Sequence, residues 1–157
     1  MTLQWRTLAF SELTGAQVYA LLRLRQQVFV VEQNCAYLDL DNLDQQAIHM
    51  LCLHNGALMA YQRCLAPGVS YPESSLGRIV VCPTRRGQHL GRNLVLRGIA
   101  HNLAQWPDSG IRINAQAYLE EFYTALGFVA EGSAYLEDNI LHRQMRYRQS
   151  IVPAAAT

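Results

Sequence analysis

The sequence predicts a single α/β domain of the α+β type, built on a mixed, mostly antiparallel central sheet with helices on both faces. The chain has 157 residues, and 50% of them are hydrophobic, which is enough to bury one core. Short apolar segments of strand length alternate with segments that repeat apolar residues at helical spacing. Turn signals such as Asn55-Gly56 join consecutive strands as hairpins, which excludes an all-parallel sheet.

The first half of the chain predicts a strand, a helix and three further strands. Leu3–Leu8 has the length and composition of a short strand. Thr14 and Gln17 have the spacing of a capping box, so a helix begins there, and its apolar face continues to Phe29. Arg25 lies on that face, and either its stem packs there or its charge is held for a partner. The next strands are predicted at Ile48–Leu53, Ala57–Leu65 and Ser75–Cys82.

The second half predicts two helices, one strand and a closing hairpin. Pro83 ends the preceding strand, and Gly127 is placed as the C-terminal glycine of the second of these helices. The elements are helix Leu90–Leu103, strand Ile111–Ala115, helix Leu119–Leu126 and strands Phe128–Leu136 and Ile140–Tyr147. Residues 1–150 therefore form the domain, and residues 151–157, which are small and apolar, are expected to be a flexible tail.

Charge and composition exclude several classes of partner. Lys and Arg number 13 against 12 Asp and Glu, so a net charge of +1 provides no bulk attraction for nucleic acid. No apolar run approaches the roughly 18 residues of a membrane span, and the N-terminus lacks the pattern of a signal peptide. No cysteine pair has C-x-x-C spacing, so we expect reduced thiols, no metal and a cytoplasmic location. The cysteines are Cys35, Cys52, Cys64 and Cys82.

An acidic, irregular stretch runs from Cys35 to Gln46 and contains Asp39, Asp41 and Asp44. It is either a solvated loop or the mouth of a site that attracts a cationic substrate. The glycine and the final glutamate of an EF-hand loop are missing, so calcium is not expected.

The segment from Val80 to Arg92 predicts an anion site. A buried strand enters a loop with glycine and arginine, and the loop enters a helix whose first turn has unpaired N–H groups. Arg85, Arg86 and Arg92 can add charge-assisted hydrogen bonds. The lysine of a phosphate-binding P-loop is absent, as is the third glycine of a dinucleotide fingerprint.

Two motifs in this region resemble those of the GNAT superfamily of N-acetyltransferases. The run Arg86-Gly87-Gln88-His89-Leu90-Gly91 is similar to its acyl-CoA signature, Arg/Gln-x-x-Gly-x-Gly/Ala, with His89 where glycine is usual. The run from Phe122 to Phe128 is similar to its Phe-Tyr-x-x-x-Gly-Phe motif. Residues 24–35, 115–117 and 137–145 resemble the ElaA-like branch, so the resemblance covers nearly the whole chain.

The resemblance implies a sheet that is splayed at its fourth strand and a binding site for acetyl-CoA as co-substrate. In this family the pantetheine lies along the fourth strand, and the diphosphate lies on the loop before the helix. A backbone N–H at the end of the fourth strand, which corresponds to Val80–Val81 here, donates a hydrogen bond to the oxyanion. Gln116 stands where many members have an asparagine. The implied co-substrate contacts are Ile79, Val80, Val81, Arg86, Gly87, Gln88, His89, Leu90, Gly91, Arg92, Gln116 and Tyr123.

The resemblance also assigns catalytic roles. Tyr123 is at the position of the general acid that protonates the leaving thiolate. Glu32, His49, Glu73 and His142 are candidates for the general base. His49 is expected to be a structural hydrogen-bonding residue and Glu73 a solvated loop residue, whereas Glu32 could bind the acceptor ammonium instead of taking its proton. The residues expected to contact the acceptor are Arg25, Glu32 and His142.

The expected function is therefore acetyl transfer from acetyl-CoA to a primary amine by direct attack in a ternary complex. The acceptor would be a small amine or a protein lysine or N-terminus. The alternative is a non-catalytic acyl-CoA-binding regulatory module. A third class, an ATP- or NAD-binding domain, is disfavoured because the required lysine and ribose-binding acid are absent. A homodimer is compatible with this fold.

Overall fold

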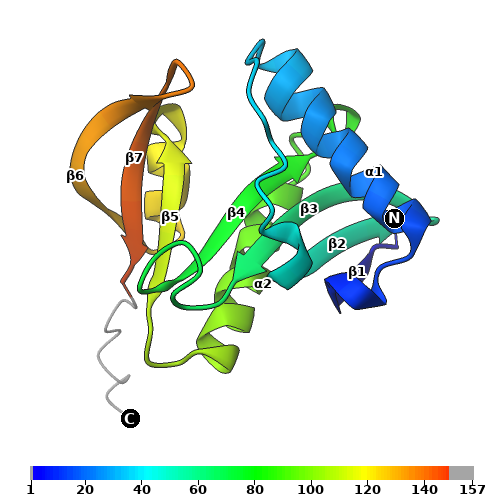
Figure 1. The fold of residues 1–157 in the computed structure, drawn as a ribbon, viewed down its shortest axis with the longest axis horizontal. Helices are drawn as coiled ribbons and strands as arrows, with labels where there is room; N and C mark the ends of the chain where they lie inside the picture. The colour runs from blue at the N-terminus through cyan, green and yellow to red at the C-terminus, as the bar shows by residue number, and fades with distance from the viewer. Residues whose placement is uncertain (1, 149–157) are drawn as a thin grey trace.

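A seven-stranded mixed sheet organises residues 2–148, the part of the chain that the computed structural model describes (Figure 1). Its strand order is β1-β2-β3-β4-β5-β7-β6, and only β4 and β5 are parallel neighbours. The tail predicted over 151–157 lies outside the described residues. The strands are β1 (Gln4–Ala9), β2 (Ile48–His54), β3 (Ala57–Leu65), β4 (Ser74–Val81), β5 (Ile111–Gln116), β6 (Phe128–Glu137) and β7 (Ile140–Tyr147). The α-helices are α1 (Gly15–Arg25), α2 (Leu90–Gln105) and α3 (Glu120–Ala125).

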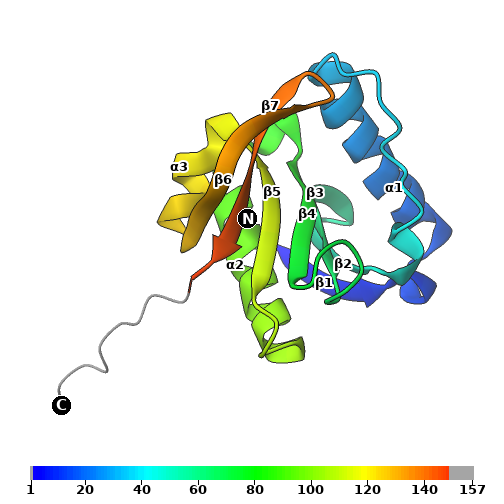
Figure 2. The same cartoon turned by 60° about the vertical axis from the view of Figure 1, so that its left-hand side comes forward.

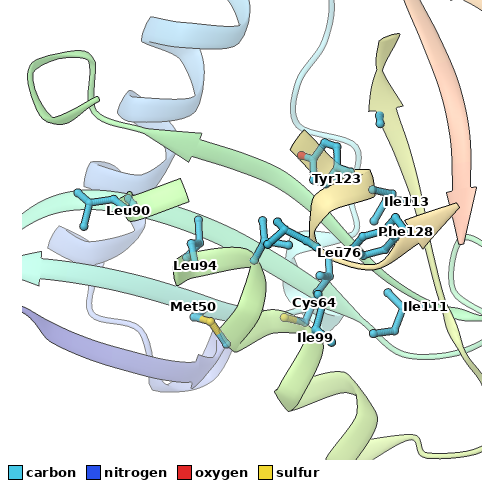
Figure 3. Packing of buried hydrophobic residues seen from close by; sticks show 14 of the residues in the cluster. Met50, Cys64, Leu76, Leu90, Leu94, Ile99, Ile111, Ile113, Tyr123 and Phe128 are labelled. Atoms are coloured by element: carbon cyan, nitrogen blue, oxygen red, sulfur yellow. The ribbon is translucent and has the colours of Figure 1, made fainter. Parts of the chain in front are cut away.

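Helices cover both faces of the sheet, as the sequence predicted (Figure 2). Strand alternation supplies a core to each face, because successive side chains of a strand point in opposite directions. Met50 of β2 belongs to the core beneath α2 and α3, whereas its neighbour Leu51 belongs to the core beneath α1. Figure 3 shows the first of these cores, in which Leu94 and Ile99 of α2 lie among strand residues and Tyr123 of α3 joins them.

The start of α1 confirms the predicted capping box. The Thr14 hydroxyl accepts a hydrogen bond from the Gln17 N–H at 3.1 Å, and the Thr14 N–H donates to Gln17 Oε1 at 2.9 Å. The end of this segment differs from a regular helix, because residues Gln26–Glu32 continue as a π-helix. Such wide turns are frequent at functional sites. Here the π-helix brings Phe29 to the wall of the cavity described below.

The sheet opens between β4 and β5. These strands pair only at Ser74 with Ile111 and at Ser75 with Arg112, and then diverge (Figure 1). Asn102 of α2 fixes the closed end, because its buried amide donates to Ser74 Oγ at 3.2 Å and to the Ser75 carbonyl at 3.1 Å. The splay at the fourth strand that the family resemblance implied is therefore confirmed.

A network of three arginines and three aspartates, four of them buried, holds the segment between the π-helix and β2. Arg25 is 0% exposed, and its guanidinium contacts Asp39 at 2.8 Å and Asp44 at 2.7 Å. Arg63 contacts Asp41 and Asp44, and Arg78 contacts Asp39 and Asp41, at distances between 2.5 and 3.3 Å. Burial of these charges is tolerated because each carboxylate meets two guanidinium groups.

This network corrects two expectations from the sequence. Arg25 does not contact an acceptor, because its charge is held by aspartates in the interior. The acidic stretch is neither a solvated loop nor a cation-attracting mouth, since Asp39 and Asp44 are buried and all three aspartates are neutralised by arginine. Spacing along the chain could not reveal this, because the partners lie at least 14 residues apart.

His49 closes the inner end of the network and is structural, as predicted. Its ring donates from Nε2 to the Asp44 carbonyl at 2.8 Å, and its Nδ1 accepts from the Tyr61 hydroxyl at 2.6 Å. Burial lowers the pKa of His49 below its ordinary value, so the folded protein holds this ring neutral.

Of the four unpaired cysteines, Cys52 and Cys64 are buried as expected. Within residues 2–148, no helix is both long and apolar enough to cross a membrane.

Substitution Arg25→Met is expected to destabilise the fold by about 3 kcal/mol, because it leaves Asp39 and Asp44 buried with one cation each. Urea denaturation measures this change. Arg23→Met, on the exposed face of the same helix, removes the same charge and is expected to have little effect. Equal stability of the two variants would show that the network contributes no net stability.

The neutral state of His49 predicts a pH-dependent stability. The unfolded chain binds a proton at this imidazole below about pH 6.5, but the folded protein resists it, so stability is present above that pH and falls below it. We expect the free energy of unfolding to fall more between pH 7.5 and 5.5 in the wild type than in His49→Gln. His54→Gln, at the end of β2, is the control for a histidine-to-glutamine change outside the network. A His49→Gln slope equal to that of wild type would contradict this assignment.

Candidate functional site

A cavity of about 860 Å³ lies where β4 and β5 diverge. This volume is within the usual range for sites that bind small molecules and cofactors. Its walls come from the open edge of β4, the end of β5, helix α3, the π-helix, the segment that follows it and the β6–β7 hairpin. The predicted site residues among the lining are Glu32, Ile79, Val80, Val81, Arg86, Gly91, Gln116, Tyr123 and His142.

The edge of β4 presents unpaired backbone groups to this cavity. The Cys82 N–H donates to the Met59 carbonyl of β3 at 2.8 Å, so by antiparallel alternation the Val81 N–H points to the opposite edge. Among the described residues, that edge has no strand partner beyond Ser75. It can therefore accept an extended ligand as an additional strand, or donate a hydrogen bond to an oxyanion.

A β-bulge turns β4 as it leaves β5. Tyr61 pairs with Val80 and Arg63 with Gly77, so β4 carries one residue more than β3 over this interval. Arg78 lies within the bulge and has a φ of +52°, a left-handed conformation that is unusual for a non-glycine residue. Its guanidinium is held by Asp39 and Asp41 in the network, which compensates for this strain.

The loop before α2 enters the helix through a left-handed residue. His89 precedes the first turn of α2 with φ +60° and ψ 17°, so it occupies the left-handed conformation that glycine adopts readily. Arg86 and Gly91 line the cavity, whereas five other predicted contacts do not. The Leu90 side chain is buried in the core, so only its backbone can face an anion. The five residues are Gly87, Gln88, His89, Leu90 and Arg92.

Glu32 forms an ion pair with Arg86. Two contacts join the carboxylate and the guanidinium, at 2.5 and 2.9 Å, and both side chains are about half exposed. The hydrogen bond from Arg86 lowers the pKa of Glu32, so this carboxylate is a weak base. Glu32 therefore holds the guanidinium that the family motif assigns to the co-substrate phosphates.

Tyr123 faces the cavity from α3 with most of its ring in the core. The residue is 6% exposed, and its ring makes edge contacts with Phe122 at 5.0 Å and with Phe128 at 5.9 Å. Burial raises the pKa of the Tyr123 hydroxyl, which keeps it protonated and able to donate. Gln116, at the end of β5, lines the cavity and donates to Gln33 Oε1 at 3.2 Å.

His142 lies at the hairpin end of the cavity. Its Nδ1–H donates to the Ile140 carbonyl at 2.7 Å, so in the neutral ring Nε2 carries the lone pair. Glu137 Oε2 lies 3.8 Å from that nitrogen, and Asn114 Nδ2 donates to the same oxygen at 2.8 Å. Sequence reasoning did not single out Glu137 or Asn114. The Asp138-Asn139 turn was the available signal, because it fixes the pairing of Glu137 with Ile140 and of Tyr135 with His142.

Glu73 is not part of this site. It is 9% exposed, its carboxylate contacts Arg112 at 3.0 Å, and it does not line the cavity. The expectation of a solvated loop residue was therefore wrong. The ion pair with Arg112 lowers the pKa of Glu73.

In the described part of the chain, no group of three or more His, Cys, Asp or Glu side chains is placed to hold a metal ion.

The sheet, its open edge and the loop before α2 define an acyl-CoA-dependent acyltransferase architecture. The chain belongs to the acetyltransferase (GNAT) domain family, which matches residues 25–149. It is 40% identical over 149 residues to the UPF0039 protein sll0451 of Synechocystis, covering 94% of this chain and 97% of that protein.

Solved structures agree with this assignment. An acyl-CoA N-acyltransferase from Pseudomonas aeruginosa superposes with a TM-score of 0.89 at 39% identity, covering 94% of this chain and all of that one. ElaA from Escherichia coli superposes with a TM-score of 0.88 at 37% identity over the same share of each chain. The family and the ElaA-like branch that the sequence motifs indicated are confirmed.

The Glu32–Arg86 pair predicts how co-substrate affinity responds to mutation. Glu32→Gln should tighten CoA binding up to about fivefold, because an exposed ion pair of at most ~1 kcal/mol no longer competes for Arg86. Titration calorimetry measures the Kd. Glu121→Gln, an exposed carboxylate on α3 that does not line the cavity, controls for net charge. Weaker CoA binding by Glu32→Gln than by the control would refute competition for Arg86.

Proposed function

We propose that this protein transfers an acetyl group from acetyl-CoA to the nitrogen of a primary amine, by direct attack within a ternary complex. The observation that carries this proposal is the juxtaposition, in one cavity, of the open β4 edge, Tyr123 and His142. These groups supply the three things that aminolysis of a thioester requires: a donor for the oxyanion, an acid and a base.

The co-substrate would lie along β4. Its pantetheine would pair with the free edge at Ile79–Val81, which has no strand partner there. The diphosphate would lie at the first turn of α2, where Gly91 brings the backbone to the cavity and Arg86 supplies positive charge. His89 adopts the left-handed backbone conformation that the usual glycine at this position adopts readily, so the turn into α2 can be the same.

The chemistry follows from this placement. An alkyl ammonium has a pKa near ~10.4, so His142 Nε2 must take a proton before attack. The amine lone pair then forms the C–N bond, and the carbonyl π electrons move to oxygen, where the Val81 N–H stabilises the charge. When the C–S bond breaks, the Tyr123 hydroxyl donates its proton to the CoA thiolate. The nitrogen, positively charged after attack, loses its extra proton to the tyrosinate, and the imidazolium releases its proton to solvent.

The acceptor remains a class: a small amine, or the lysine or N-terminus of a protein. The four unpaired cysteines and the use of acyl-CoA support a cytoplasmic location. A non-catalytic acyl-CoA-binding module would share the cavity and the open edge, so only turnover separates the two functions.

Turnover is tested by thiol release from acetyl-CoA with a panel of primary amines. We expect activity in the wild type and a loss of about 10²-fold in kcat for Tyr123→Phe, with the Kd for CoA changed less than twofold. Tyr147→Phe removes a phenol that packs on Phe128 away from the cavity, and should retain activity. Tight CoA binding without turnover on any amine would favour the binding module. Full activity of Tyr123→Phe would show that Tyr123 is not the general acid.

A further inference from the structure

Uncompensated negative charge gathers at one end of the cavity. Four carboxylate residues line it, and arginine neutralises two of them: Glu32 pairs with Arg86, and Asp41 pairs with Arg63 and Arg78. The other two are Glu137 and Asp138, in the β6–β7 hairpin. Across residues 2–148, no arginine or lysine forms an ion pair with either of them.

Neutral groups hold Glu137 in place without cancelling its charge. The Gln144 amide donates to the Tyr135 hydroxyl at 2.9 Å, and that hydroxyl donates in turn to Asn114 Oδ1. Asn114 Nδ2 donates to Glu137 Oε2 at 2.8 Å. Within residues 2–148 the second carboxylate oxygen of Glu137 has no such partner, and the side chain is 52% exposed, so this oxygen is available to a ligand.

A second feature of the same end points to a ligand. His142 is only 9% exposed, stacks on Tyr135 with ring centroids 6.4 Å apart, and uses Nδ1 for the Ile140 carbonyl. His142 lines the cavity, and its Nε2 lies 3.8 Å from Glu137 Oε2, beyond hydrogen-bond distance, with no other partner among the described residues. A nitrogen lone pair on a nearly buried ring, beside a free carboxylate oxygen, is a complementary site for an ammonium group.

We propose that Glu137 binds the acceptor as its ammonium ion, and that with Asp138 it makes this site select cationic amines that lack a nearby carboxylate. This inference rests on the proposed function and names its substrate class. The ammonium donates one N–H to Glu137 and one to His142 Nε2. The second N–H bond breaks toward the imidazole, and Glu137 remains beside the imidazolium that forms. An anionic group on the acceptor would meet the charges of Glu137 and Asp138 and be repelled.

Three amines with a four-carbon chain test this selectivity: 1,4-diaminobutane, butylamine and 4-aminobutyrate, whose far ends are cationic, neutral and anionic. We expect kcat/KM to fall in that order, by at least tenfold between the first and the last. Glu137→Gln should reduce kcat/KM for the diamine about tenfold or more and shrink the ratio between the diamine and 4-aminobutyrate. Its Kd for CoA should stay within twofold of wild type, which also shows that the variant is folded.

Asp108→Asn is the matched control, because it removes one exposed negative charge outside the cavity. Calorimetric binding of the diamine and of 4-aminobutyrate to the CoA-saturated protein gives a second readout that needs no turnover. Equal affinity for the two ligands, or a Glu137→Gln variant that behaves like Asp108→Asn, would overturn the inference. Selective diamine binding without thiol release would instead support this site and reject the proposed catalysis, so the two failures are distinguishable.

Discussion

The divergence of β4 and β5 is the constraint on which the rest of the molecule depends. Two adjacent parallel strands would ordinarily satisfy each other's N–H and C=O groups along their length. Here pairing stops after Ser75 and Arg112, and the bulge at Arg78 turns β4 away. The Asn102 amide holds the closed end, so the sheet opens in one direction only. The freed edge of β4 and the cavity beside it are consequences of that geometry.

Charge is distributed in two different ways around this cavity. On the α1 side, aspartates pair with arginines, so the wall carries little net charge. On the hairpin side, Glu137 is held by the neutral Asn114 amide, and its charge remains available. A carboxylate can thus shape the protein or attract a ligand, and the identity of its partner decides which. Glu32 belongs to the first kind: because it is paired with Arg86, it is not free to act as a general base.

Much of the fold could be predicted from the sequence, because the determining interactions are short-range. The capping box at Thr14, the Asn55-Gly56 turn and the alternation within β2 involve residues a few positions apart. The predicted strand at Ala57–Leu65 matches β3 to the residue. The loop before α2 could also be predicted, because its motif from Arg86 to Gly91 is a local feature of the backbone. The π-helix after α1 was not, because apolar periodicity does not distinguish a regular turn from a wide one.

The sequence by itself therefore determined the order of elements, the family motifs and the positions of Tyr123 and His142 in their elements. Tertiary structure decided what each charged side chain does. Arg25 and Asp39 are 14 residues apart, and Arg86 and Glu32 are 54 apart, so no local pattern predicts those pairs. Glu137 became a candidate ligand-binding residue only when the hairpin register placed it beside His142, where it forms no arginine ion pair within residues 2–148. The physical reason is that secondary structure depends on neighbouring residues, whereas electrostatic pairing depends on which distant segments the fold brings together.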